Sequence, residues 1–163
     1  MYKRQLIELT DALGGKTTYT YNKKGLPSGV TDGGGNTYEM TYTATGLYDT
    51  ITAPDGTTVK YEYNRLNQPV KETRSSGLVT EYEYDAKGRV THTWDNEGFE
   101  EIYEYDAYGN KSSVTNALGE ETRYSYDKYQ RLVEVVEADG AKNTYTYDEA
   151  VSYTHLRAHE TSA

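Results

Sequence analysis

The sequence predicts an all-β fold in which short hairpins stack edge to edge into one continuous antiparallel sheet. Three observations carry this prediction. A glycine recurs every 21 residues, a pair of aromatic residues follows it at a fixed distance, and turn residues separate two short β-type segments in each repeat. A fixed period over most of a chain is the signature of a repeat protein. Residues that recur in every repeat belong first to the framework, so a single active site would have to lie outside the pattern.

The recurring glycine occupies one position in seven successive repeats. Its members are Gly14, Gly35, Gly56, Gly77, Gly98, Gly119 and Gly140. Seven occurrences at one position indicate a backbone conformation that glycine adopts at lower cost than other residues. We therefore expect Gly77 and Gly119 to have positive φ, or to lie where a Cβ atom would clash with the next repeat.

An aromatic couplet begins five residues after each glycine. Its members are Tyr19/Tyr21, Met40/Tyr42, Tyr61/Tyr63, Tyr82/Tyr84, Tyr103/Tyr105, Tyr124/Tyr126 and Tyr145/Tyr147, with Met40 as the one departure from tyrosine. The residue between the two aromatics is polar in every repeat, so both rings point to the same side of a strand. The couplet thus predicts a strand with one half-buried face and one solvated face.

Turn signals follow the couplet and precede the repeated glycine. Asp or Asn follows the couplet directly in six repeats, at Asn22, Asn64, Asp85, Asp106, Asp127 and Asp148. These side chains cap turns, and a glycine three residues later, as at Gly25 and Gly88, supplies positive φ. Thr43 replaces the Asp of this turn, and Asn67 and Gln130 replace its glycine. A second β-type segment, such as residues 131–135, then leads to the next turn.

One hairpin per repeat is the arrangement that fits 21 residues without a helical stripe. A lone hairpin is marginal in water, so neighbouring repeats have to share hydrogen bonds and aromatic contacts. We interpret residues 1–150 as the repeat array, with six full repeats from Tyr19 to Thr144 and a partial repeat at each end. Residues 151–163 leave the pattern, and we interpret them as a non-native tail with few contacts to the repeats.

Composition excludes several classes of function. The 163 residues carry a net charge of −9 and no cysteine, which leaves no disulfide framework and no thiolate metal site. No apolar run is long enough to span a membrane, and the first residues lack the apolar stretch that is typical of a signal peptide. An acidic chain without basic clusters is a poor partner for nucleic acid.

Several residues suggest chemistry, but repetition favours a framework role for most of them. The carboxylate pairs Glu83/Asp85 and Glu104/Asp106 have a spacing that a glycosidase could use, yet they recur at a strand position and a turn cap. His155 and His159 stand four residues apart, but lack the glutamate of a zinc-protease motif. His92 and Trp94 each occur once, on a second strand. We therefore predict no catalytic residue, no cofactor and no metal site, and no enzyme activity.

The period and the motif Tyr-x-Tyr-Asp-x-x-Gly-Arg resemble the Rhs repeat, also called the YD repeat. Residues 82–90 carry the nearest match, and residues 103–110 and 124–132 match almost as well. The resemblance extends over residues 1–150. This family includes polymorphic toxins, wall-associated proteins, C components of insecticidal toxin complexes and teneurins.

The resemblance implies a curved sheet that forms part of a spiral β-shell. It also implies that the chain is a structural segment of a large secreted or cell-surface protein, whose shell encloses a C-terminal toxin domain. The expected partners are then neighbouring repeats of the same parent chain and the enclosed toxin. The alternative is an adhesion module that binds surface carbohydrate through exposed aromatic rings. Such modules rely on tryptophan, and this chain has only Trp94.

Overall fold

The computed structural model describes residues 5–147 and 159–160. The chain divides into two compact units, residues 1–81 and 82–163. The strands that lie within the first unit are β1 (Glu8–Thr10), β2 (Lys16–Tyr21), β3 (Pro27–Thr31), β4 (Thr37–Tyr42), β5 (Tyr48–Thr52), β6 (Thr58–Tyr63) and β7 (Pro69–Arg74). Strand β8 (Val79–Tyr84) contains the boundary between the units. The second unit continues with β9 (Val90–Asp95), β10 (Glu100–Tyr105), β11 (Lys111–Asn116), β12 (Glu121–Tyr126), β13 (Leu132–Val136), β14 (Lys142–Thr144) and β15 (His159–Glu160).

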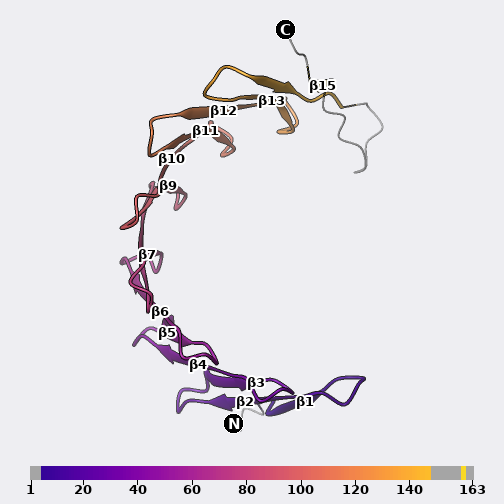
Figure 1. Cartoon of the computed structure of the whole chain (residues 1–163), viewed down its shortest axis with the longest axis vertical. Coiled ribbons are helices and arrows are strands. Elements are labelled where there is room, and N and C mark those ends of the chain that lie inside the picture. Colours follow the sequence, from indigo (N-terminus) through magenta and orange to yellow (C-terminus); the bar gives the residue numbers. More distant parts are fainter. Residues whose placement is uncertain (1–4, 148–158, 161–163) are drawn as a thin grey trace. The chain divides into compact units, whose positions relative to one another are not determined.

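Within each unit the strands lie in the sheet in chain order, and each pairs antiparallel with the next (Figure 1). Each 21-residue repeat contributes two strands, and the described residues contain no helix. The predicted all-β fold of stacked hairpins is therefore confirmed. Over the same residues there is accordingly no helical segment able to cross a membrane.

Both turns of a repeat use the same backbone hydrogen bonds. In the turn after the couplet, the Asp85 N–H donates to Arg89 O at 2.9 Å and the Gly88 N–H donates to Asp85 O at 3.0 Å. The turn before the next couplet repeats this pattern, because Gly119 N–H donates to Asn116 O at 2.9 Å. This is a three-residue hairpin loop, residues 86–88 in the first of these turns, whose third residue has to be left-handed.

The repeated glycine provides that left-handed residue. Gly77 has φ of 95° and Gly119 has φ of 78°, so the predicted positive φ is confirmed at both. A Cβ atom added to either glycine would meet no other atom within 4 Å. The requirement for glycine at these positions is therefore conformational rather than steric.

The turns with unusual residues keep the same geometry. Asn67 and Gln130 each have φ of 63°, and among the described residues they are the only non-glycine residues with positive φ. Thr43 takes the capping role of Asp, since its Oγ1 accepts from the Leu47 N–H at 3.1 Å. The stacked hairpins on either side thus fix the backbone conformation of the turn. Residues other than Asp and Gly adopt that conformation when they stand in it.

A β-bulge lies at the start of the second strand in five repeats. Glu104 pairs with Ser113, but the next residue, Tyr105, pairs with Lys111. Ser112 is therefore an extra residue on β11. The same shift occurs in the pairs β2–β3, β4–β5, β6–β7 and β12–β13. Bulges increase the local twist of a strand pair.

The sheet is a single layer with little core. None of the large side chains in the described residues is fully buried, and Val135, at 8% exposure, is the one buried hydrophobic residue. Thr93 and Ser113 are buried as well. Most of the stability must therefore come from the ladder of backbone hydrogen bonds and from half-buried side chains on the two faces of the sheet.

Two residues of the tail pair with the repeat array. His159 lies opposite Thr144 and Glu160 lies opposite Asn143, which makes β15 an outer neighbour of β14. The expectation of few contacts did not include this strand pairing, because the sequence of the tail does not continue the period. The rest of that expectation falls on residues 151–158 and 161–163, outside the described residues.

Candidate functional site: the tyrosine face

We call the side of the sheet that carries the couplets the tyrosine face, and the other side the polar face. All thirteen couplet tyrosines and Met40 are half-buried, whereas the residue between each couplet is exposed. The predicted strand with one half-buried and one solvated face is therefore present in the first six repeats. The couplet of the last repeat, Tyr145/Tyr147, follows directly after β14.

The first tyrosine of a couplet faces a residue on the second strand of its own hairpin. Tyr19 lies opposite Val30, Tyr103 opposite Val114, and Tyr124 opposite Val135. Cross-strand pairs of an aromatic with a β-branched residue stabilise a sheet. Sequence reasoning missed this column, although its 21-residue spacing, with Ile51 as a further member, is visible in the sequence.

The second tyrosine links its hairpin to the one before. The Tyr126 hydroxyl donates to Lys111 O at 2.9 Å, and the Tyr147 hydroxyl donates to Leu132 O at 2.7 Å. In each case the acceptor is 15 residues earlier, at the first residue of the preceding second strand. The same bond joins Tyr21 to Leu6 O, Tyr42 to Pro27 O, and Tyr105 to Val90 O.

At Pro27, Lys111 and Leu132 the accepting carbonyl lies beside a bulge, where the regular ladder is interrupted. A buried or half-buried carbonyl without a partner is costly. This explains why the second position of the couplet is tyrosine rather than phenylalanine. The sequence pattern gave the position of the ring, but the acceptor depends on the bulge and could not be read from it.

Burial raises the pKa of several couplet tyrosines. The shift is largest at Tyr103, where burial, followed by a hydrogen bond from its hydroxyl to Glu101, raises the pKa to about 12. Burial likewise raises the pKa of Tyr84, Tyr124 and Tyr126. These tyrosines therefore stay protonated as hydrogen-bond donors well above neutral pH, which suits a structural role.

An arginine after the first turn covers the second tyrosine of the next repeat in two places. The Arg89 guanidinium lies 4.2 Å from the centre of the Tyr105 ring, and Arg131 lies 4.5 Å from that of Tyr147. Asp85 holds Arg89 in place through a hydrogen bond of 2.7 Å from Nε to Oδ2. The buried Nη1 of Arg89 has no hydrogen-bond partner among the described residues, and the neighbouring ring offers it a cation–π contact.

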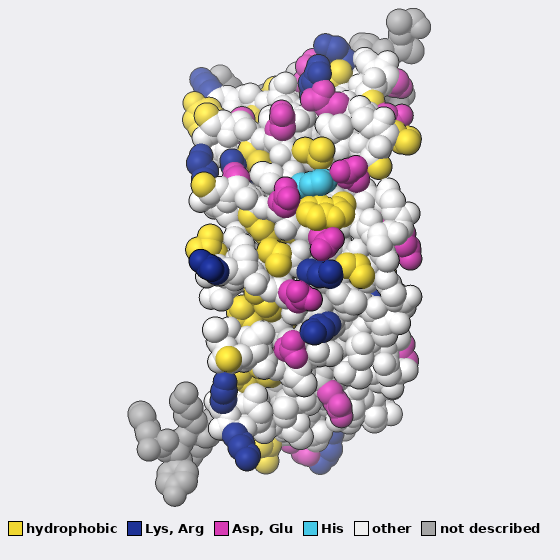
Figure 2. Space-filling view, turned by 90° about the vertical axis from the view of Figure 1, so that its left-hand side faces the viewer, with side chains coloured by type: hydrophobic (Ala, Val, Ile, Leu, Met, Phe, Trp, Pro, Cys, Tyr) yellow, Lys and Arg dark blue, Asp and Glu magenta, His cyan; other side chains and the backbone are white. Residues whose placement is uncertain are grey.

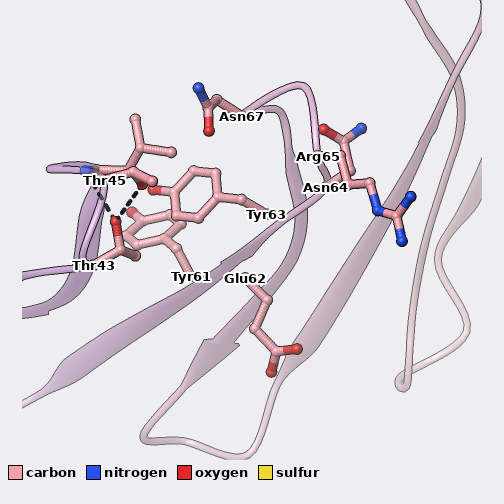
Figure 3. Close-up of a pocket in the computed structure, with 9 residues that line it drawn as sticks. Thr43, Thr45, Tyr61, Glu62, Tyr63, Asn64, Arg65 and Asn67 are labelled. Atoms are coloured by element: carbon pink, nitrogen blue, oxygen red, sulfur yellow. Dashed lines mark hydrogen bonds between the residues drawn. The ribbon is translucent and has the colours of Figure 1, made fainter.

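A pocket of about 490 Å³ lies on the tyrosine face beside β6, where Tyr61 and Tyr63 line it. Figure 3 shows the Tyr61 and Tyr63 rings lying toward Thr43 and Thr45, with Glu62 pointing away from the rings. The ring centres of Tyr61 and Tyr63 are 6.4 Å apart. In this turn Leu47 stands where Arg89 and Arg131 stand in other repeats, so the rings have no cationic cover of that kind.

The carboxylates considered for glycosidase chemistry do not form acid–base pairs. Asp85 accepts from the backbone N–H groups of Lys87 and Arg89, and those bonds lower its pKa. Asp106 caps its turn through Asn110, and its pKa is lowered in the same way. Glu83 instead points toward His92. The two aspartates are thus committed to turns as ionised caps.

The described residues hold no group of three His, Asp or Glu side chains suited to a metal ion. His155 lies outside the described residues, and so does the side chain of His159. The geometry of the described residues thus offers a framework of recurring tyrosines.

Comparison with known families agrees with this geometry. A model of the teneurin YD-shell matches residues 49–156, which is more than half of the chain. The chain belongs to the YD-shell family. A second model, the RHS repeat, matches residues 5–37. A search of the curated proteins found no match.

Solved structures with the same fold come from a toxin complex. The crystal structure of TcdB2-TccC3 has a TM-score of 0.70 and 21% identity, over 82% of this chain and 9% of that chain. TcdB2-TccC3 without its hypervariable C-terminal region gives a TM-score of 0.70 and 21% identity, over 82% and 8%. The Photorhabdus luminescens Tc holotoxin pore gives 0.69 and 21%, again over 82% and 8%. This YD-shell chain thus spans about a tenth of the length of these structures.

Proposed function

We propose that the chain is a stretch of shell wall in a large secreted or cell-surface protein, and that this wall encloses a C-terminal toxin domain. The observation that carries the proposal is a sheet one layer thick whose recurring side chains all serve the sheet itself. The tyrosines bridge hairpins and the aspartates cap turns. A sheet of this kind divides two spaces, and the division requires no chemical step.

The enclosed-toxin part of the proposal draws on the similar structures. One of them is TcdB2-TccC3 without its hypervariable C-terminal region, so the complete protein has such a region. We infer the same arrangement for the parent of this chain. The segment itself then has no catalytic activity, and its contact with the toxin would be non-covalent.

Limited proteolysis of the full-length parent protein tests the proposal. A toxin domain inside an intact shell should resist a protease that digests the same domain when it is made alone. The double variant Tyr105→Ala and Tyr126→Ala removes two bridges between hairpins and should make the domain cleavable.

Tyr108→Ala serves as the control, because Tyr108 is 79% exposed in a turn and joins no hairpins. It should leave the toxin domain protected. A parent whose C-terminal domain is digested at the same rate with and without the shell would overturn the proposal, and so would a parent without such a domain.

A further inference from the structure

One repeat departs from the others on the polar face. Trp94 stands in a column that is threonine in five other described strands, namely at Thr10, Thr31, Thr52, Thr73 and Thr115. Phe99 and Ile102 also stand where most other repeats have small or polar residues, and His92 occurs in the same repeat. Because these residues do not recur, the shell framework does not require them.

Strand pairing brings these non-recurring residues close to one another. In the β9–β10 hairpin His92 lies opposite Ile102, and Trp94 lies opposite Glu100. The His92 and Trp94 ring centres are 4.4 Å apart. We call these four residues together with Phe99 the aromatic patch.

The aromatic patch borders a pocket of about 380 Å³ that His92, Trp94, Phe99 and Glu100 line together with Asp95 and Gly98. Phe99 is 47% exposed and Ile102 is 45% exposed. Neither figure fits a residue whose role is to fill a core. Exposed apolar side chains that gather in one patch commonly mark an interaction site.

Acidic side chains surround the aromatic patch. His92 Nε2 lies 2.8 Å from Glu100 Oε1, and His92 Nδ1 lies 3.8 Å from Glu83 Oε2. No ion pair from Lys or Arg to Glu83 or Glu100 is found among the described residues. Figure 2 shows acidic side chains around the histidine, with a large hydrophobic side chain beside it.

Aromatic rings beside carboxylates suit a cation with an apolar stem. Arg and Lys side chains place such a cation over an aromatic face, with a carboxylate to pair with it. A neutral sugar could stack on the rings, but it would gain no electrostatic attraction from the excess negative charge. Charge complementarity therefore favours a basic peptide over a carbohydrate.

We propose that the aromatic patch binds a basic peptide segment of a partner protein. One Arg or Lys side chain lies against Trp94 and Phe99 and pairs with Glu100, while a neighbouring apolar side chain covers Ile102. His92 is a positioning residue, because its hydrogen bond holds Glu100 next to the rings. This site is separate from the shell function and does not depend on it.

Trp94 makes the test direct, because it is the only tryptophan in the chain. A short synthetic peptide with two arginines around an isoleucine should change the tryptophan fluorescence in a saturable way, at about 0.15 M salt to screen distant charges. A peptide with the arginines replaced by glutamates should cause no change. Calorimetric titration gives the affinity of variants that lack the tryptophan.

Three variants locate the site. Trp94→Thr and Phe99→Thr install residues that other repeats carry at these positions, at Thr115 and Thr57, so the fold should be kept. Each of them, and Glu100→Gln, should weaken peptide binding at least ten-fold. Tyr108→Ser and Glu134→Gln, which remove an exposed aromatic and a polar-face charge elsewhere in the same unit, should leave it unchanged.

The proposal has clear opposing outcomes. Absence of saturable binding to the wild-type chain would overturn it, as would equal loss of binding in Tyr108→Ser and Trp94→Thr. A neutral oligosaccharide that binds the patch and is not displaced by the basic peptide would assign the site to carbohydrate instead. Should Trp94→Thr fail to fold, Phe99→Thr and Glu100→Gln decide the question in the same way.

Discussion

In five of the seven couplets, a single hydroxyl group on the second tyrosine connects neighbouring repeats. Tyr126→Phe keeps the ring but removes the bond to Lys111 O, which leaves that carbonyl without the donor it has now. We expect a loss of about 1 kcal/mol in the free energy of unfolding, measured by urea denaturation.

Tyr129→Phe is the matched control for that change. Tyr129 is 67% exposed in the following turn, so removing its hydroxyl should alter stability by less than about 0.5 kcal/mol. Equal effects of the two substitutions would mean that the bond between hairpins contributes nothing to stability.

The left-handed turn residues allow a test in two directions. Gly119→Ala places a Cβ atom at φ of 78°, and we expect it to destabilise the fold by about 1 kcal/mol or more. Gln130→Gly relieves a side chain at φ of 63°, and should be neutral or stabilising by less than about 1 kcal/mol. Thermal melting of both variants checks the pair, and destabilisation by both would contradict the conformational argument.

Tyr103 gives the fold a weakness at alkaline pH. Its pKa is raised in the folded state to about 12 from the ordinary 10.0, so the folded state holds its proton more firmly than the unfolded state does. The corresponding stability is fully present below pH 10 and is lost as pH rises toward 12. Urea midpoints across this range should fall with pH.

Tyr103→Phe provides the control for the pH series. This variant lacks the titrating hydroxyl, so its midpoint should fall less steeply between pH 10 and 12 than that of the wild-type chain. Parallel curves would show that other groups cause the alkaline loss.

At the level of strands and turns, most of the fold could be predicted from the sequence. The couplet gave the first strand of each hairpin, and the glycine column gave the left-handed turn residue, because both depend on local geometry. The bulge at Ser112 and the acceptor at Lys111 could not be predicted, since they arise from pairing between strands. The pairing of His159–Glu160 was missed because no periodic signal marks it.

The aromatic patch was only half visible in the sequence. His92 and Trp94 stood out as single occurrences, but their alignment with Glu100 and Ile102 depends on the register of β9 and β10. Phe99 lies in the turn region between those strands, where sequence pattern says little about which pocket a side chain lines.

Strand β1 has an apolar edge that invites association. It is the first strand of the sheet, and Leu6, Ile7 and Leu9 in and beside it are 55%, 70% and 51% exposed. Edge strands with such side chains pair readily with other chains, and a lysine at the edge suppresses this. We expect the segment to self-associate, and Ile7→Lys to reduce the association.

Sedimentation velocity across a salt series measures this association. The net charge of −9 opposes contact between chains, so association should increase as salt screens that charge. Leu66→Lys adds the same charge at an exposed turn and should reduce association less than Ile7→Lys does. A monomer at every salt concentration would contradict the prediction.

For the molecule as a whole, a one-layer sheet explains how a chain with so few Leu, Ile, Val and Phe residues can fold. Leu, Ile, Val and Phe together account for 24 of the 163 residues. That number could not fill a core between two layers, but a sheet stabilised by shared ladders and half-buried tyrosines does not need one. Stability in such arrays is the sum of weak repeats and the contacts between neighbours.

The direction of the tyrosine bridges also matches the order in which the chain is synthesised. Each of the five bridges described above runs from a hydroxyl to a carbonyl 15 residues nearer the amino terminus. During synthesis the ribosome therefore makes every acceptor before its donor, and each new hairpin completes the one that emerged just before it. Chains fold from the amino terminus as they are made, so the array can grow by one hairpin at a time with a single unfinished repeat at the ribosome.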